Sequence, residues 1–219
     1  MSQPATLAQR LTAEALGSAL LAAAVIGSGV MAERLAGGNV AIALLANTLT
    51  TKAALYALIV AFGSISAQFN PAVTLALLWL RRLPARQALA IVAVQILAMI
   101  GGAMLAHAMF GLPLLQIASK TRDGYALVLA EIVATFGLLL VILLVECRRA
   151  DAVPAAVACW IGAAYWFTAS TSFANPAITL ARALSDTFAG IAPGNAPGFV
   201  LGQALGAALA VAAFRLLRR

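Results

Sequence analysis

Two short motifs of the sequence place an asparagine directly before a proline, and the asparagine side chains offer polar groups that suit a binding site. FNPAVTLAL begins at Phe69 and ANPAITLAR begins at Ala174, so the two share the core Asn-Pro-Ala-(Val/Ile)-Thr-Leu-Ala. An asparagine oxygen is a strong helix N-cap, and proline is favoured at the first helical position. Once the oxygen is used, the side-chain NH2 group stays free to donate hydrogen bonds. The motif residues are Asn70, Pro71, Ala72, Asn175, Pro176 and Ala177.

The helices that these phrases start are too short to cross a bilayer. A helix over 71–80 is about 15 Å long at ~1.5 Å per residue, which is half of a hydrocarbon core of roughly 30 Å. The second phrase predicts a similar half-helix over 176–188. Two half-helices can meet head to head, and each N-terminus carries about +0.5 elementary charge. The pair would oppose cations, including the hydrated proton.

The composition indicates an integral membrane protein. The chain is 63% hydrophobic and only 10% charged, whereas soluble domains are roughly 25% charged. Six apolar runs are long enough to span a bilayer, which takes about 20 residues each. We therefore expect an all-α membrane protein with six transmembrane helices and two re-entrant half-helices. The runs are 11–32, 39–62, 87–110, 125–146, 153–170 and 198–216.

The net charge of +7 reflects membrane topology rather than nucleic-acid binding. If the N-terminus is inside, nine basic residues fall on the inner side and five do not, which fits the positive-inside rule with both termini cytoplasmic. The inner set is Arg10, Arg81, Arg82, Arg86, Arg148, Arg149, Arg215, Arg218 and Arg219, and the others are Arg34, Lys52, Lys120, Arg122 and Arg182.

The two halves of the chain repeat one pattern. Ala-Glu pairs end at Glu14 and Glu131, near the start of the first and fourth runs, and Gln95 and Gln203 follow the two NPA segments. Each half reads span, span, NPA segment, span. Because three spans is an odd number, the halves must be inverted, approximately 1–110 and 125–219, within one channel domain over 1–219. Such repeats place the site near the midplane.

Several buried polar side chains have more than one interpretation. Glu14 and Glu131 are either a proton relay or acceptors for backbone N–H groups of the re-entrant loops, and we favour the second because intramembrane carboxylates are usually paired. His107 fits packing better than a proton or metal site. Cys147 and Cys159 predict buried thiols, not a disulfide or metal site. We expect no cofactor, no metal and, without a nucleophile–base pair, no enzyme.

Taken together, these motifs resemble the major intrinsic protein family, the aquaporins and aquaglyceroporins, over essentially the whole chain. The resemblance rests on Glu14, 66–74, Gln95, Glu131 and 173–177. It implies an aquaporin-like, right-handed bundle in the lipid bilayer, small neutral solutes, and a homotetramer in which each protomer has its own pore. It agrees with loop support as the role of the two carboxylates.

The resemblance also implies a selectivity filter of four residues, Thr50, Ala163, Ser172 and Ile178. Ile178 stands where the family usually has arginine, so this set contains no aromatic and no charged side chain. We expect a wide filter that discriminates weakly among hydroxylated solutes. Gln68 stands where the family often has histidine, which puts a histidine gate in doubt.

In its arginine-free filter, the sequence resembles the bacterial branch of the family that is associated with arsenic-resistance genes. The resemblance implies a passive channel in the bacterial inner membrane for metalloid hydroxides such as arsenous acid, with glycerol and water. One alternative is a general channel for glycerol, urea and water. Another is a secondary transporter, although such a protein usually needs an ionisable residue at its central site. A structural protein with a closed pore is a third.

Two cations and one long segment have open roles. Arg182 lies four residues after Ile178 and shares its helix face, so it is either a displaced filter cation in the extracellular vestibule or the surface partner of Asp186. Lys52 either snorkels, lines the tetramer axis, or replaces the missing arginine. The segment 111–124 could fold over the extracellular mouth.

Overall fold

The computed structural model describes residues 5–218, and within that range it is all-helical. This confirms the predicted fold class. Arg219, which the sequence places with the inner basic residues, lies outside the described residues. The eight α-helices are α1 (Leu7–Leu35), α2 (Val40–Phe62), α3 (Pro71–Trp79), α4 (Ala85–Met109), α5 (Tyr125–Glu146), α6 (Val153–Phe167), α7 (Pro176–Ala183) and α8 (Ala196–Leu217), with 3₁₀ turns at Ala150–Ala152 and Pro193–Asn195.

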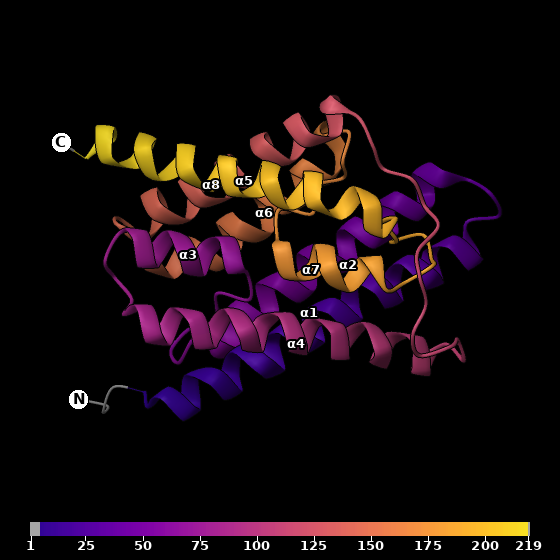
Figure 1. Cartoon of the computed structure of the whole chain (residues 1–219), viewed down its shortest axis with the longest axis horizontal. Helices are drawn as coiled ribbons and strands as arrows, with labels where there is room; N and C mark the ends of the chain where they lie inside the picture. Colours follow the sequence, from indigo (N-terminus) through magenta and orange to yellow (C-terminus); the bar gives the residue numbers. More distant parts are fainter. Residues whose placement is uncertain (1–4, 219) are drawn as a thin grey trace.

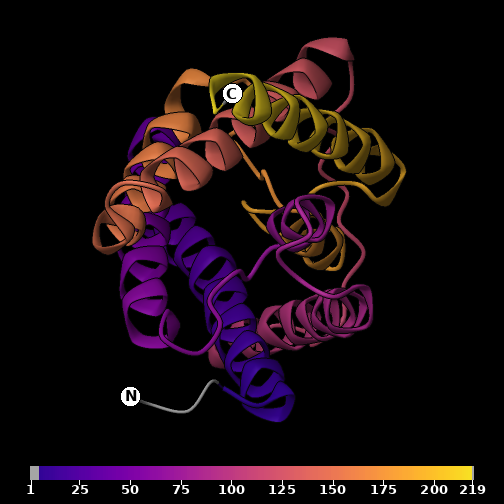
Figure 2. The same ribbon diagram turned by 90° about the vertical axis from the view of Figure 1, so that its left-hand side faces the viewer.

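The six long helices surround the two short ones. Helices α3 and α7 lie end to end along the long axis of the bundle, and in the end-on view they overlap inside the ring of long helices (Figures 1 and 2). Helix α1 packs mainly on α4, and α5 packs on α8. We call the end where α1 begins and α8 finishes the termini end, and the opposite end the far end.

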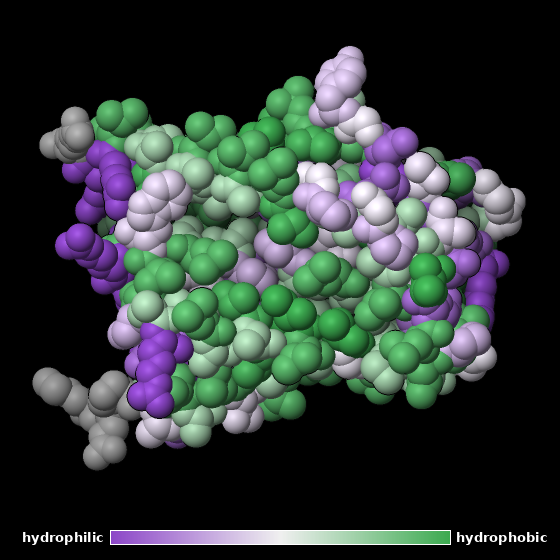
Figure 3. Space-filling model, viewed as in Figure 1, coloured by the Kyte–Doolittle hydropathy of each residue, from purple (hydrophilic) through white to green (hydrophobic). Residues whose placement is uncertain are grey.

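The outer surface of the bundle is suited to lipid. Figure 3 shows a hydrophobic band across the middle of the molecule, with hydrophilic residues gathered toward its two ends. Six helices, the last two counted with their 3₁₀ turns, are long and apolar enough to cross a membrane. Large apolar side chains such as Leu97 and Leu201 are exposed on this surface. The chain is therefore an integral, multi-pass membrane protein.

Helix α7 is shorter than the sequence predicted, and the expected range 176–188 is wrong at its C-terminal end. The helix finishes at Ala183. Its last carbonyls bond to two loops instead of continuing the helix, because Ala118 N–H donates to Ala183 and Ile191 N–H donates to Arg182. Loop contacts distant in sequence therefore decide where this helix stops.

Candidate functional site

Each motif asparagine caps its own half-helix and also holds the opposite loop. Asn70 Oδ1 accepts from Ala72 N–H at 2.9 Å, and Asn175 Oδ1 accepts from Ala177 N–H at 3.0 Å. Across the centre, Asn70 Nδ2 donates to Ala174 O and Asn175 Nδ2 donates to Phe69 O, both at 2.8 Å. Each NH2 group therefore donates as expected, with one of its two hydrogens bonded to the opposite loop. Each keeps one of its two hydrogens for another partner.

The Glu14 carboxylate fixes the loop that leads into α3. It accepts from the backbone N–H groups of Gln68 and Phe69, both at 2.8 Å. The Ser66 hydroxyl donates to it at 2.6 Å and Gln95 Nε2 donates at 2.9 Å. Glu14 is fully buried, so its charge is balanced by a shell of four donors. These four hydrogen bonds account for the buried Glu14 carboxylate without a proton relay.

Glu131 does the same for the loop that leads into α7. It accepts from the backbone N–H groups of Phe173 at 2.9 Å and Ala174 at 2.8 Å. Gln203 Nε2 donates to it at 2.6 Å and to Thr179 Oγ1 at 2.9 Å. The two halves of the chain thus build their loop supports from the same residue types.

These supports hold backbone that is strained. Phe69 has φ 47°, and in the second loop Thr171, Ser172 and Ala174 have φ 62°, 49° and 48°. Residues with a Cβ rarely adopt this left-handed region, and each costs roughly 1–3 kcal/mol. The hydrogen bonds that the loop N–H groups donate to Glu14 and Glu131 therefore maintain a conformation that the chain alone would leave.

A cavity of about 460 Å³ follows one side of the two half-helices. Its middle is lined by Asn70 and Asn175, and much of the remaining wall is aliphatic. Gln68 also lines it, and the Gln68 Oε1 atom accepts from Thr74 Oγ1 at 2.7 Å. At the termini end the lining includes Arg10 and Glu146. The far-end lining is Thr51, Tyr165, Ser172, Phe173, Ile178 and Arg182.

Two of the four predicted filter residues do not line this cavity. Thr50 and Ala163 are exposed on the outside of the bundle, and the Thr50 hydroxyl bonds to Ala46 O in its own helix. Thr51 and Tyr165 line the cavity instead, and Tyr165 Oη donates to Thr51 Oγ1 at 3.3 Å. Adjacent helical residues point about 100° apart, so a small error in a carried-over count turns a side chain outward.

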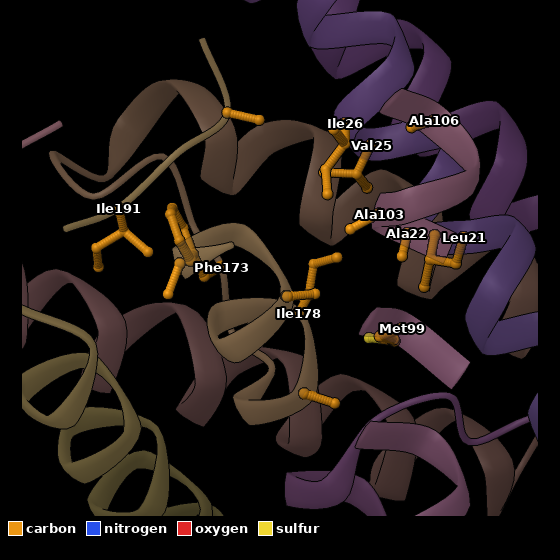
Figure 4. Packing of buried hydrophobic residues seen from close by; sticks show 14 of the residues in the cluster. Leu21, Ala22, Val25, Ile26, Met99, Ala103, Ala106, Phe173, Ile178 and Ile191 are labelled. Carbon is orange, nitrogen blue, oxygen red and sulfur yellow. The ribbon is translucent and has the colours of Figure 1, made fainter. Parts of the chain in front are cut away.

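The other two predicted filter residues, Ser172 and Ile178, line the cavity. Ser172 is 2% exposed and Ile178 is 5% exposed, and within residues 5–218 the Ser172 hydroxyl has no hydrogen-bond partner. In Figure 4, Ile178 lies between Phe173 and the side chains of α1. Tyr165 was missed, although Val157, Ile161 and Tyr165 recur every four residues and so share the helix face that lines the cavity.

Arg182 is neither exposed nor paired with Asp186. It is 2% exposed, Nε donates to Ala189 O, and the guanidinium carbon lies 3.4 Å from the centroid of the Phe173 ring. Asp186 instead accepts from Ser119 N–H and Oγ, both at 2.8 Å. The prediction of a surface ion pair between Arg182 and Asp186 is therefore wrong. Tyr165, Phe173 and Arg182 also line the far end of the cavity, so aromatic and charged groups stand beside the predicted filter residues Ser172 and Ile178.

The segment 111–124 packs across the far end (Figure 1) and contributes a cation that the sequence did not identify as a site residue. Arg122 Nε donates to Gly190 O at 2.9 Å and Nη1 to Ser170 O at 3.3 Å. Its guanidinium carbon lies 5.1 Å from the Phe173 ring centroid. Arg122 therefore joins the loop before α7 to the loop after it.

Lys120, on the same segment, is exposed overall but its ammonium group is partly desolvated. Nζ donates to Phe188 O at 2.8 Å and lies 4.6 Å from the centroid of that ring. Burial of the ammonium, followed by the charges of Arg122 and Arg182, lowers the pKa of Lys120 from 10.5 to about 8. Lys120, Arg122 and Arg182 therefore lie close enough together for their charges to repel one another.

The remaining polar residues have structural positions. His107 is fully buried, with Nδ1 at 2.8 Å from Leu114 O and Nε2 at 2.8 Å from Ser185 Oγ, so it ties two far-end loops together. Lys52 packs against Gly162 and is not among the cavity-lining residues.

Cys147 is half-buried and Cys159 exposed, so the expectation of buried thiols is wrong. Residues 5–218 contain no His/Cys/Asp/Glu group that could hold a metal ion.

Comparisons with known proteins agree with this architecture. A family model described as major intrinsic protein matches residues 1–173. The chain is 50% identical over 212 residues to Aquaglyceroporin AqpS of Rhizobium meliloti (strain 1021), covering 96% of this chain and 91% of that protein. The X-ray structure of the aquaglyceroporin from Plasmodium falciparum matches with a TM-score of 0.64 at 17% identity, covering 97% of this chain and 95% of that one.

Proposed function

Since the chain belongs to the major intrinsic protein family, we propose that it is a passive transmembrane channel for small uncharged solutes. The solutes we propose are metalloid hydroxides such as arsenous acid, together with glycerol and water. The relative at 50% identity is named as an aquaglyceroporin, which supports glycerol. A lining that combines aliphatic walls with a few amide, hydroxyl and carbonyl groups suits a solute with several hydroxyls, which arsenous acid and glycerol share.

The position of Ile178 is the observation that carries the proposal. Ile178 presents an aliphatic side chain to the cavity beyond Asn175. The nearest cation on the same helix, Arg182, is held against Phe173 and bonded to Ala189 O. We propose that Arg182 is a displaced filter cation, which repels cations at the mouth without filling the passage beside Ile178.

We propose the same assembly and orientation that the sequence suggested. In this proposal residues 1–219 form one channel domain made of inverted halves, approximately 1–110 and 125–219. Four copies form a homotetramer in a bacterial inner membrane, with both termini in the cytoplasm. The matching donor shells around Glu14 and Glu131 support the inverted repeat.

Stopped-flow light scattering on proteoliposomes tests this function with arsenous acid, glycerol, urea and water. We expect Ile178→Arg to slow arsenous acid and glycerol entry at least about tenfold, which is ~1.4 kcal/mol on the barrier. Arg182 lies one turn away on the same face, and like charges at that spacing repel, so the new guanidinium would be pushed into the passage. Ile178→Leu, which conserves volume, is the control and should stay near wild type.

The alternatives give different results in the same assay. Equal entry of glycerol and urea with no entry of arsenous acid would indicate the general channel. Saturation at low solute concentration, or dependence on an ion gradient, would indicate a transporter. Rapid water flux without entry of any solute in the wild type would contradict the proposal and leave a plain water channel.

A further inference from the structure

We infer that the far end of the cavity contains a binding subsite for a small carboxylate-type oxyanion, formed by the Arg182 guanidinium and the Ser172 hydroxyl. The inference goes beyond the proposed conduction of uncharged solutes. It rests on that function in one respect, because the subsite lies on the proposed solute path.

Arg182 is a buried cation whose donors are mostly unused. A guanidinium has five N–H donors, and among residues 5–218 only Nε has a hydrogen-bond acceptor, Ala189 O. One face of the group covers the Phe173 ring. The salt bridges in that part of the chain are Arg82–Glu146 and Arg149–Asp151, so no carboxylate neutralises Arg182. A buried unpaired charge is costly, and an anion that reaches the cavity would relieve that cost.

Ser172 supplies the second, independent group. The residue is 2% exposed and lines the same cavity as Arg182, and its Oγ has no partner in the part of the chain that the structure describes. Its backbone is held in the left-handed region at φ 49°, next to Phe173, whose N–H is fixed by Glu131 at 2.9 Å. The hydroxyl is therefore positioned by the loop and has no partner in the described part of the chain, but Oγ is enclosed, so a ligand must displace neighbouring atoms to reach its hydrogen.

The surrounding charges favour an anion over a neutral solute. Arg122 contacts the same Phe173 ring as Arg182 from the 111–124 segment, and Lys120 lies near enough to both for their charges to lower its pKa. The nearest buried carboxylate, Glu131, already accepts three hydrogen bonds from the loop and Gln203. Arg182 is the charged side chain of the far-end lining, and a fixed positive charge beside a low-dielectric wall raises the local concentration of anions.

The shape of the guanidinium selects the ligand class. Its parallel N–H donors match the two oxygens of a carboxylate, and such charge-assisted pairs are roughly twice as strong as neutral hydrogen bonds. Formate is the smallest carboxylate and fits easily within a cavity of about 460 Å³. Formamide has nearly the same size and shape without the charge, so the two probes separate charge recognition from simple occupancy.

Glycerol entry into proteoliposomes, with formate at equal concentration inside and outside, tests the subsite without adding an osmotic gradient. At a formate concentration equal to its Kd, half of the channels are occupied and glycerol entry should fall about twofold. Formamide at the same concentration should not change it. Arg182→Gln should remove the formate effect, whereas Arg34→Gln, an exposed far-end arginine that contacts Phe110, should keep it.

Thermal unfolding of the detergent-purified protein gives a readout that does not depend on conduction. Formate should raise the Tm of wild type and of Arg34→Gln more than formamide does. If Arg182→Gln does not fold, Ser172→Ala takes its place, and it should reduce the difference between the formate and formamide shifts. The inference is overturned if formate has no effect in wild type, if formamide acts equally, or if Arg182→Gln keeps the effect. Absence of glycerol entry without formate would instead contradict the proposed function.

Discussion

Glu131→Ala is expected to destabilise the protein by several kcal/mol and to abolish solute entry. The substitution leaves three buried donors without their acceptor, namely Phe173 N–H, Ala174 N–H and Gln203 Nε2, although Gln203 keeps Thr179. An unsatisfied buried donor costs about 1–3 kcal/mol, and whole-domain stabilities are only about 5–15 kcal/mol. The strained residues Ser172 and Ala174 would then relax toward ordinary φ values.

Relaxation of this loop would also move the functional groups that it carries. Phe173 supports the guanidinium of Arg182, and Asn70 Nδ2 bonds to Ala174 O. The damage would therefore reach the far-end lining and the central asparagines together. Loss of stability and loss of flux should appear in the same variant.

Melting in detergent and stopped-flow glycerol entry check this prediction against two further variants. Glu131→Gln keeps one acceptor oxygen but places an NH2 group against an N–H, so it should fall between wild type and Glu131→Ala. Glu33→Gln removes an exposed carboxylate on α1 and should change neither property. If Glu131→Ala melted like wild type, the carboxylate would not be what holds the loop.

The starts of the half-helices could be predicted from the sequence because capping is local. Asn70 and Pro71 set the start of α3 through contacts within three residues, and Asn175 and Pro176 do the same for α7. The end of α7 could not be predicted in this way. It depends on Ala118 and Ile191, which reach the helix only after the far-end loops have folded.

The filter lining was the least predictable part of the site. In a soluble helix, an apolar stripe shows which face is inside, but here lipid makes the outer face apolar as well. Helix α2 exposes Leu45 and Leu49 on its surface, so nothing in its pattern distinguishes Thr50 from Thr51. The family spacing then decides the choice, and it selected a residue one position from the cavity-lining Thr51 on α2 and two positions from the cavity-lining Tyr165 on α6.

The far-end cations show a second limit of sequence-based prediction, because residues that are distant in the sequence meet only in the folded protein. Arg122 and Arg182 lie sixty residues apart in the printed sequence, yet both guanidinium groups lie on the Phe173 ring. The spacing of Arg182 from Ile178 correctly suggested a shared face, but its carbonyl partner belongs to the loop after α7. The loop after α7 that buries Arg182 still leaves it in the wall of the cavity.

Gly102→Leu is expected to disrupt the packing of α1 on α4, while the same change at the neighbouring Gly101 is tolerated. A Cβ at Gly102 would overlap the backbone oxygen of Ala19 and lie 2.9 Å from the Ala22 Cβ. Backbone cannot rotate away as a side chain can, so the two helices would have to separate. Small residues let membrane helices approach closely, and this crossing relies on that approach.

The expected loss lies at or above the ~1–3 kcal/mol typical of overpacked cores, because α1 also carries Glu14, the support of the first loop. A Cβ at Gly101 meets nothing within 4 Å, and replacing glycine within a helix favours helix formation by up to about 1 kcal/mol. Size-exclusion profiles and melting in detergent would compare the pair. Equal Tm values for the two variants would contradict the prediction. They would mean that α1 and α4 can separate without loss of stability, and that the loop support at Glu14 tolerates this movement.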